Sequence, residues 1–208
     1  MASLKTITGF KSKLAGGGAR SNLFEVSIPA FPSIVSGWDN ETFEFMCKGA
    51  PIPAAITPPV DVSFRGRTLK VPGDRQFDPW TITVINDENL KIRTAFERWS
   101  NAINRLDTGT GVTNPEAYMA AVGYVYQYGR GADTGIESST ISNATNNTSI
   151  RPIRTYVIHN IWPSNVSAID LNWDSVDQIQ NFTVEFQMTH WTAGDANGVS
   201  DIVSDPVN

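Results

Sequence analysis

Four cationic side chains lie in or just before the stretch GRTLKVPGDRQFDPW, residues 66–80, which also contains a tight Pro-Gly-Asp turn. They are Arg65, Arg67, Lys70 and Arg75. Backbone amides at a glycine turn, together with several arginines and lysines, can cradle a phosphate. The alternative is a corner that holds the fold together. The elements that position this stretch decide between the two.

Other residue types that do chemistry are sparse and poorly spaced for it. His159 and His190 lie on separate predicted strands without an H-x-H or H-x-x-H partner, which favours packed or surface histidines over metal ligands. Asp170, Asp174 and Asp177 lack the glycine and the closing glutamate of an EF-hand calcium loop. A triglycine near the N-terminus lacks the lysine of a phosphate loop. The sequence predicts no enzyme and no bound cofactor or metal.

The composition is that of a chain with a sizeable core. Its 208 residues are 40% apolar and 10% aromatic, with six tryptophans, so one large domain is expected. Cys47 is the single cysteine, which excludes an intrachain disulfide, and its alternating neighbours indicate a core residue. The net charge of −5 argues against a general affinity for nucleic acid or anionic membranes, because such affinity rests on clustered positive charge.

Alternation of apolar and polar residues, which is typical of half-buried strands, recurs along the chain. The segments with this pattern are 22–29, 41–48, 60–66, 80–86, 118–128, 154–162 and 181–191. The side chains predicted to face inward from the second and third of these strands are Phe43, Phe45, Cys47, Val60, Val62 and Phe64. The strands are joined by short turns without a βαβ rhythm, so the sheets are expected to be antiparallel.

One segment has the period of a helix. Over residues 87–104, apolar side chains recur at intervals of four, three and four from Ile92 to Ile103, and Asn86 or Asp87 is predicted to cap the first turn. The predicted fold is mainly β: two packed antiparallel sheets, as a sandwich or barrel, with this one flanking α-helix.

The remaining segments set the domain boundaries. Residues 1–20 are predicted to be a flexible arm that orders only on assembly, and 21–192 a single domain. Residues 129–150 are rich in Gly, Ser, Thr and Asn, which indicates a surface insertion, and 193–208 is expected to be a loose acidic tail.

Three stretches together give the chain a family resemblance. They are GGGARSNLFEVSIP, CKGAPIPAAITPPVDVSFRGRTLKVPGDRQFDPWTITVINDENLKIRTAFERW and WPSNVSAIDLNWDSVDQIQNFTVEFQMTHW. In these the chain resembles the tail tube proteins of T4-like contractile-tailed bacteriophages, which are related to the tube proteins of type VI secretion. The resemblance implies six copies closing into a ring, and rings stacked into a tube inside a contractile sheath. It also implies baseplate and tail terminator proteins as partners, a place in the virion, and a lumen that conducts the genome without binding it specifically.

Placing residues in such a tube gives three sets of expected positions. A lumen ringed with cations would hold DNA fast, so the basic corner is predicted at subunit contacts. The set at subunit contacts is Arg65, Arg67, Lys70, Asp74, Arg75 and Asp78. The stiff, apolar stretch PIPAAITPP is predicted in the contact between stacked rings, through Pro51, Ile52, Pro53, Ile56, Pro58 and Pro59. Glu44, Asp61 and Ser63 are predicted to face the lumen, with the Thr183, Glu185 and Gln187 face as the next candidate.

Two alternatives stay open on the sequence. One is a baseplate tube initiator or cap with the same fold. The other, of a different class, is a carbohydrate-binding β-sandwich that uses Trp38, Trp162 or Trp173 as a sugar platform. Indefinite polymerisation, arrest at one ring and a stable monomer would distinguish the three readings.

Overall fold

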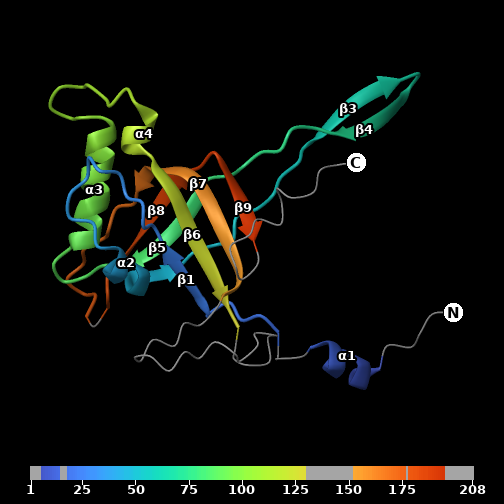
Figure 1. The fold of residues 1–208 in the computed structure, drawn as a ribbon, viewed down its shortest axis with the longest axis horizontal. Coiled ribbons are helices and arrows are strands. Elements are labelled where there is room, and N and C mark those ends of the chain that lie inside the picture. Colours follow the sequence, from blue (N-terminus) through green and yellow to red (C-terminus); the bar gives the residue numbers. More distant parts are fainter. Residues whose placement is uncertain (1–5, 15–17, 130–151, 177, 195–208) are drawn as a thin grey trace, which may run out of the picture. The chain divides into compact units, whose positions relative to one another are not determined.

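The computed structural model describes residues 6–14, 18–129, 152–176 and 178–194 (Figure 1). In chain order the elements are α1 (Ile7–Lys13), β1 (Phe24–Ser27), α2 (Asn40–Met46), β2 (Cys47–Gly49), β3 (Pro59–Phe64), β4 (Arg67–Pro72), β5 (Trp80–Ile85), α3 (Lys91–Ile103), α4 (Pro115–Tyr118), β6 (Ala120–Tyr128), β7 (Pro152–Val166), β8 (Asn181–Gln187) and β9 (His190–Gly194). None of the helices in these ranges is both long enough and apolar enough to cross a membrane. The predicted insertion beyond residue 129 and the predicted tail beyond residue 194 lie outside the described residues.

The chain divides into two compact units. The larger one comprises Val26–Val125 and Tyr156–Thr192, and we call it the body. The smaller one comprises Met1–Glu25, Tyr126–Thr155 and Ala193–Asn208. In the smaller unit, the Tyr128 hydroxyl donates to Glu25 and the Gln127 amide donates to the Leu23 carbonyl, so the residues before β1 are held against the end of β6.

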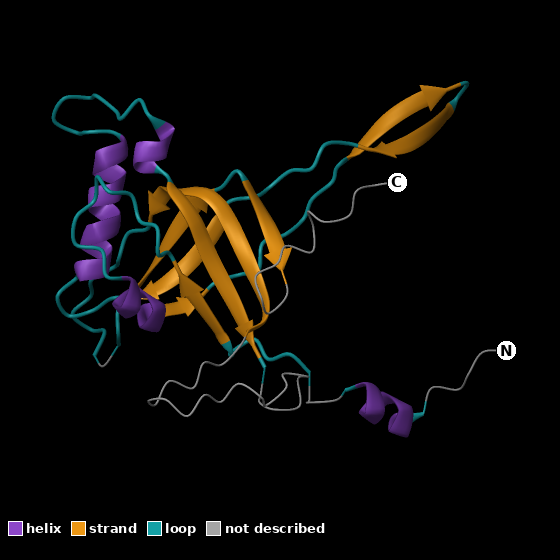
Figure 2. Cartoon of the chain, in the orientation of Figure 1, coloured by secondary structure: helices purple, strands orange, loops and turns teal. Residues whose placement is uncertain are grey.

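A seven-stranded sheet, nearly closed into a barrel, forms the framework (Figure 2). Its strand order is β1-β6-β7-β8-β5-β2, and β9 pairs with β7. The antiparallel pairing of β5 with β8 aligns their buried side chains, for example Trp80 opposite Phe186 and Ile82 opposite Val184. Because the buried residues alternate with exposed or half-buried ones on both strands, one face of this pair forms the core. The prediction of a mainly β, antiparallel fold is confirmed.

Helix α3 closes the core against this sheet. Its Ile92, Ala95, Phe96 and Trp99 are all buried. The ring centroid of Phe96 lies 5.8 Å from that of Phe186, edge to face, and the Trp99 indole donates to the Tyr118 carbonyl at 2.6 Å. Full burial of one such side chain contributes about 1.5–3 kcal/mol, so this face of α3 holds the helix to the sheet.

The segment before α2 adds a second aromatic layer to the core. Phe31 stacks on Trp38 with ring centroids 4.0 Å apart, and the Trp38 indole donates to the Ile28 carbonyl at 3.1 Å. Phe31 also contacts Trp99 edge to face, at 4.5 Å. Trp38 is therefore a packing residue, which removes one of the three tryptophans considered as a sugar platform.

The prediction of a strand over residues 41–48 is wrong. Residues 40–46 form helix α2, and only the three residues of β2 follow as a strand. Asp39 caps the helix, because its carboxylate accepts from the Thr42 amide and from the Thr42 hydroxyl. Phe43 and Cys47 are buried, as expected, but positions four apart share a face in a helix as well as in a strand. Phe45 distinguishes the two, since it is 80% exposed.

The predicted helix at 87–104 exists but begins later. Residues 91–103 are helical, and neither Asn86 nor Asp87 caps them. Instead, the Asp87 carbonyl accepts from the Leu90 amide in a turn, and Leu90 adopts a left-handed conformation with φ 53° just before the helix. Helix α1 lies in the predicted N-terminal arm and has no buried side chain.

Candidate assembly surfaces

The strand predicted at residues 60–66 is present, as β3, but its apolar side chains are exposed. β3 pairs with β4 alone, in register from Pro59 opposite Pro72 to Phe64 opposite Arg67. We call Pro59–Pro72 the hairpin. Arg65 and Gly66 form its two-residue turn, both with positive φ (46° and 80°), which is the backbone of a type I′ turn. The prediction that Val60, Val62 and Phe64 face inward is wrong for the single chain.

The register gives the hairpin one apolar and one polar face. Opposed residues share a face, so the apolar face carries Val60, Val62, Phe64, Leu69 and Val71, with Arg67 at its end. The polar face carries Asp61, Ser63, Thr68 and Lys70. Exposure of the large apolar side chains is 50% at Val60, 46% at Val62, 67% at Phe64 and 62% at Leu69. An isolated two-stranded hairpin is marginally stable in water, so burial of this apolar face against a partner surface would stabilise it.

The proline-rich stretch and the basic corner belong to the same element. The Gly73 amide donates to the Pro58 carbonyl, and the Gln76 amide donates to the Ile56 carbonyl, both at 2.8 Å. The two connections to the hairpin therefore run side by side. The Gly73 amide is engaged in this contact, so the glycine turn is not an open amide cradle for phosphate. A Cβ on Gly73 would lie 2.8 Å from the Pro58 carbonyl oxygen, which explains glycine here.

Two indoles hold the proline-rich stretch to the body. The Trp80 indole donates to the Pro51 carbonyl and the Trp191 indole donates to the Ala54 carbonyl, both at 3.0 Å. Pro53 is buried, while Ile52 remains 48% exposed. The stretch is thus anchored at its start and presents an apolar side chain to solvent.

The predicted cations and acids of the corner do not pair with one another. Arg65 lies over the Phe64 ring, 5.3 Å from its centroid, and Lys70 is the register partner of Asp61. Asp74 and Asp78 are exposed. Within the described ranges the ion pair found is Arg93 with Glu97, at 2.8 Å, and none involves the corner. The charges of the corner are therefore available to another chain.

A second exposed apolar surface escaped the sequence analysis. It is the loop 168–180, which we call the Trp173 loop. Its exposed large side chains are Leu171 at 78%, Trp173 at 100%, Val176 at 72% and Ile179 at 71%. Leu171, Trp173 and Ile179 border an open depression of about 430 Å³. The available signal was five large apolar residues, at positions 169, 171, 173, 176 and 179, interleaved with three acids.

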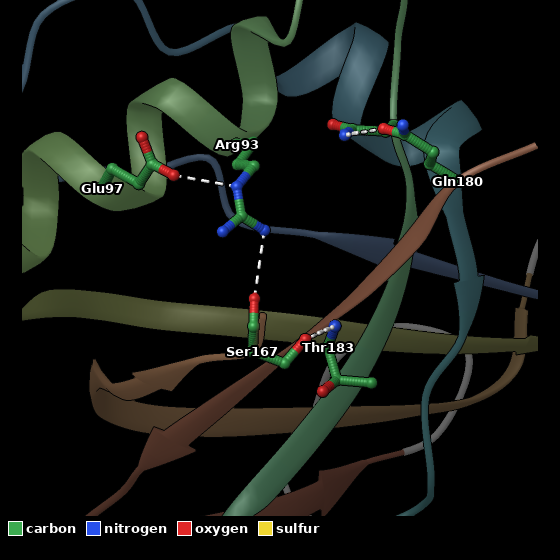
Figure 3. A network of polar contacts seen from close by, with 6 residues as sticks. Arg93, Glu97, Ser167, Gln180 and Thr183 are labelled. Atoms are coloured by element: carbon green, nitrogen blue, oxygen red, sulfur yellow. Dashed lines mark hydrogen bonds and ion pairs between the residues drawn. The ribbon is translucent and has the colours of Figure 1, made fainter. Parts of the chain in front are cut away.

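The Trp173 loop is fixed at both of its ends (Figure 3). At the start, Arg93 of α3 donates to the Ser167 carbonyl at 3.1 Å, and Ser167 exchanges two 2.9 Å hydrogen bonds with Thr183 of β8. At the end, the Asn86 amide donates to the Gln180 carbonyl at 2.9 Å, and the two side chains are 3.2 Å apart. The loop is therefore held by α3, β8 and the residue that follows β5, while its tip is exposed.

The predicted lumen residues do not lie on one face of the barrel. Glu44 is in α2, where it accepts from the Asn40 side chain at 2.6 Å, whereas Asp61 and Ser63 are on the hairpin. The strand premise is therefore wrong for Glu44, whereas Asp61 and Ser63 do lie on a strand, β3. The outer face of the β5/β8 pair is polar instead, with Thr81, Thr83, Thr183, Glu185 and Gln187 exposed or half-buried.

Three of the titratable residues lie in the core or in stacked pairs. Burial raises the pKa of the Cys47 thiol to about 12. His159 stacks on His190 with ring centroids 4.4 Å apart and lies 3.2 Å from the Thr192 hydroxyl. Burial, and then the neighbouring His190, lower the pKa of His159. Among the described residues, no group of three or more His, Cys, Asp or Glu side chains could hold a metal ion.

A family model described as phage tail tube protein matches residues 19–194. The chain belongs to this family. The tail tube protein of Enterobacteria phage T4 is 34% identical over 178 residues, which cover 85% of this chain and 93% of the relative. The family resemblance seen in the sequence is confirmed.

Two solved structures of contractile systems share the fold. One is the baseplate of the anti-feeding prophage, with a TM-score of 0.55 and 10% identity over 86% of this chain and 97% of the other. The other is the sheath/tube terminator of an extracellular contractile injection system, with a TM-score of 0.54 and 12% identity over 85% and 96% of the two chains. At these identities the likeness concerns the fold.

Proposed function

We propose that the chain is the structural tube protein of a contractile phage tail, in which rings of six copies stack into the inner tube. The observation that carries this proposal is the hairpin, whose apolar face is exposed although the seven-stranded sheet has a well-filled core. A surface of this kind is a protein contact site. Family membership supports the tube, since the T4 relative bears that name.

The basic corner and the proline-rich stretch are the proposed contacts between copies. The charges of Arg65, Arg67 and Lys70 have no ion-pair partner among the described residues, so a neighbouring copy can supply the acids. Ile52, exposed beside the hairpin base, is proposed to lie between stacked rings. Replacing Ile52 and Ile56 by aspartate is expected to permit folding and stop tube growth.

The outer face of β5 and β8 is the proposed wall of the channel, in place of the set that includes Glu44. Thr81, Thr83 and Thr183 are short and uncharged, and Glu185 adds one acid per copy. A wall without cations neutralises no phosphate, so it creates no counterion-release affinity that would hold DNA. Passage of the genome requires such a wall.

Partners at the tube ends and outside it follow from the same proposal. We propose a baseplate, a terminator and a sheath as partners, because the fold recurs in the baseplate and terminator structures of other contractile systems. The same likeness makes a baseplate initiator or cap the second candidate function.

Electron microscopy and sedimentation of the purified protein test the proposal. Tubes of one diameter and variable length are expected above a threshold concentration. Arrest at a single ring would assign the chain to the baseplate or cap. A protein that stays monomeric at concentrations far above those in a lysate would refute the assembly function.

A further inference from the structure

The hairpin and the Trp173 loop are two exposed apolar surfaces on one chain. Each carries several large side chains that are about half exposed or more, and Trp173 is wholly exposed. Contiguous exposed apolar patches in soluble proteins mark interaction sites. We propose that the apolar face of the hairpin of one copy docks on the Trp173 loop of the next copy. This inference rests on the proposed function, since it specifies the contact that propagates the tube.

The charges of the two surfaces are complementary. The hairpin has three cations, Arg65, Arg67 and Lys70, against one acid, Asp61. The Trp173 loop has three acids, at positions 170, 174 and 177, and no cation. Two hairpins facing each other would bring like charges together, and so would two loops. The pairing of a hairpin with a loop is therefore favoured over either symmetric pairing.

An unlike pairing has a structural consequence. A contact between two different surfaces is heterologous, so each copy that adds leaves one hairpin or one loop unfilled. Such contacts do not end at a dimer, and they form an open array wherever the rotation between copies does not close a ring. This is the arrangement that a tube of variable length requires.

Both surfaces are organised before they meet. The hairpin has a fixed register of six residue pairs. The Trp173 loop is held at its ends by Arg93 and Asn86, and inside it the Asn172 side chain accepts from the Asp174 amide at 3.0 Å. Preorganised surfaces lose little conformational entropy on binding.

Trp173 has the properties of the central contact residue. Tryptophan and arginine are the residues most enriched among those that dominate binding energy. An indole can cover aliphatic side chains such as Val62 and Leu69 and at the same time receive a cation on its face. Arg67 lies beside them at the end of the apolar face and is the proposed cation.

Charge reversal with exchange of partners tests the pairing. One variant carries Arg67→Asp and Lys70→Asp, and the other carries Asp170→Lys and Asp174→Lys. Each alone is expected to raise the threshold concentration for assembly about tenfold or more, because its altered surface repels its own second surface. An equimolar mixture of the two is expected to assemble near the normal threshold, as is a chain with all four substitutions. The control matched to the loop variant, Asp107→Lys with Glu116→Lys, makes the same change in net charge at exposed positions outside both surfaces and is expected to assemble normally.

Cysteine cross-linking gives an independent readout. Leu69→Cys and Ser175→Cys are placed on separate copies, which keeps Trp173 in place, and Cys47 can remain because it is buried. Disulfide dimers that form in the mixture but in neither variant alone support the pairing. Tubes without the mixed cross-link, or with unaltered thresholds in both charge variants, overturn this inference and leave the tube function standing. Unaltered protein that never assembles overturns both.

Discussion

Replacing Arg93 by glutamine is expected to lower the free energy of unfolding by about 2–4.5 kcal/mol. Arg93 makes three contacts: a hydrogen bond to the Ser167 carbonyl, an ion pair with Glu97, and a position over the Phe182 ring, 5.4 Å from its centroid. It is the residue that joins α3 to the start of the Trp173 loop, so its loss affects both.

The magnitude is a sum of three unequal contributions. A hydrogen bond from a charged donor contributes about 1.5–3 kcal/mol, and a cation over an aromatic ring about 0.5–1 kcal/mol. The Glu97 side chain is 55% exposed, so this ion pair, four residues apart on a helix, contributes about 0.3–0.5 kcal/mol after screening by solvent. In a chain of this size the total corresponds to a fall in Tm of roughly 4–18 °C.

Thermal unfolding of the unassembled protein is the assay, with Glu97→Gln as the matched control. The control removes only the ion pair and is expected to lower Tm by about 1–2 °C, an effect that high salt abolishes. Salt should leave most of the Arg93→Gln effect in place. Hydrogen exchange at the Ser167 and Thr183 amides is expected to accelerate in Arg93→Gln alone. Equal losses in the two variants would refute the reasoning, because the exposed ion pair would then dominate.

Three further predictions concern other parts of the chain. Leu69→Asp is expected to leave Tm unchanged, since Leu69 is exposed in the single chain, and to prevent tube formation in pelleting assays. Thr68→Asp on the polar face is the control, and pelleting of both variants would show that the apolar face is not a contact between copies. The Cys47 thiol has a pKa of about 12, so it is expected to resist alkylation at pH 8 in the native protein, and rapid labelling would contradict its burial. Because the thiol of the unfolded chain ionises first, the stability that the neutral thiol contributes is full below pH 9 and falls as the pH rises toward 12. Because the pKa of His159 is lowered in the folded protein, the unfolded chain binds a proton first, and stability is expected to fall as the pH drops below about 6.5. Denaturant titrations at pH 5–7 should show a smaller dependence of stability on pH in His159→Gln, and an unchanged dependence would mean that His159 does not cause it.

The local sequence was sufficient to predict the elements whose buried residues recur with the period of a strand or a helix. Alternation in β5 and β8 matched the observed core, with Trp80 and Phe186 directly opposed. The helical period from Ile92 also matched the buried face of α3. In these elements a single face contacts the core, so the pattern of apolar residues reports the backbone period.

The failures have specific physical causes. In residues 41–48, burial of Phe43 and Cys47 is compatible with the period of a strand and with that of a helix, and the N-cap at Asp39 favours the helix. The apolar alternation of β3 was read correctly as a strand, but burial was assigned to the single chain, because a pattern does not tell whether the surface it faces belongs to the same molecule. In the Trp173 loop, Ile169, Leu171 and Trp173 alternate with polar residues for only five positions, so the exposure of Leu171, Val176 and Ile179 came from the structure.

The anchoring of the Trp173 loop also bears on the order of folding. The hairpin closes within fourteen consecutive residues, and such local pairs form in about microseconds. The contacts at the ends of the loop join residues 94 and 74 positions apart, which only a nearly complete barrel brings together. An incompletely folded chain would therefore present a hairpin without an organised receptor for the next copy. If growth of the tube needs both surfaces, such a chain could bind at an end through its hairpin but could not receive the next copy. Continued elongation would therefore select completely folded subunits.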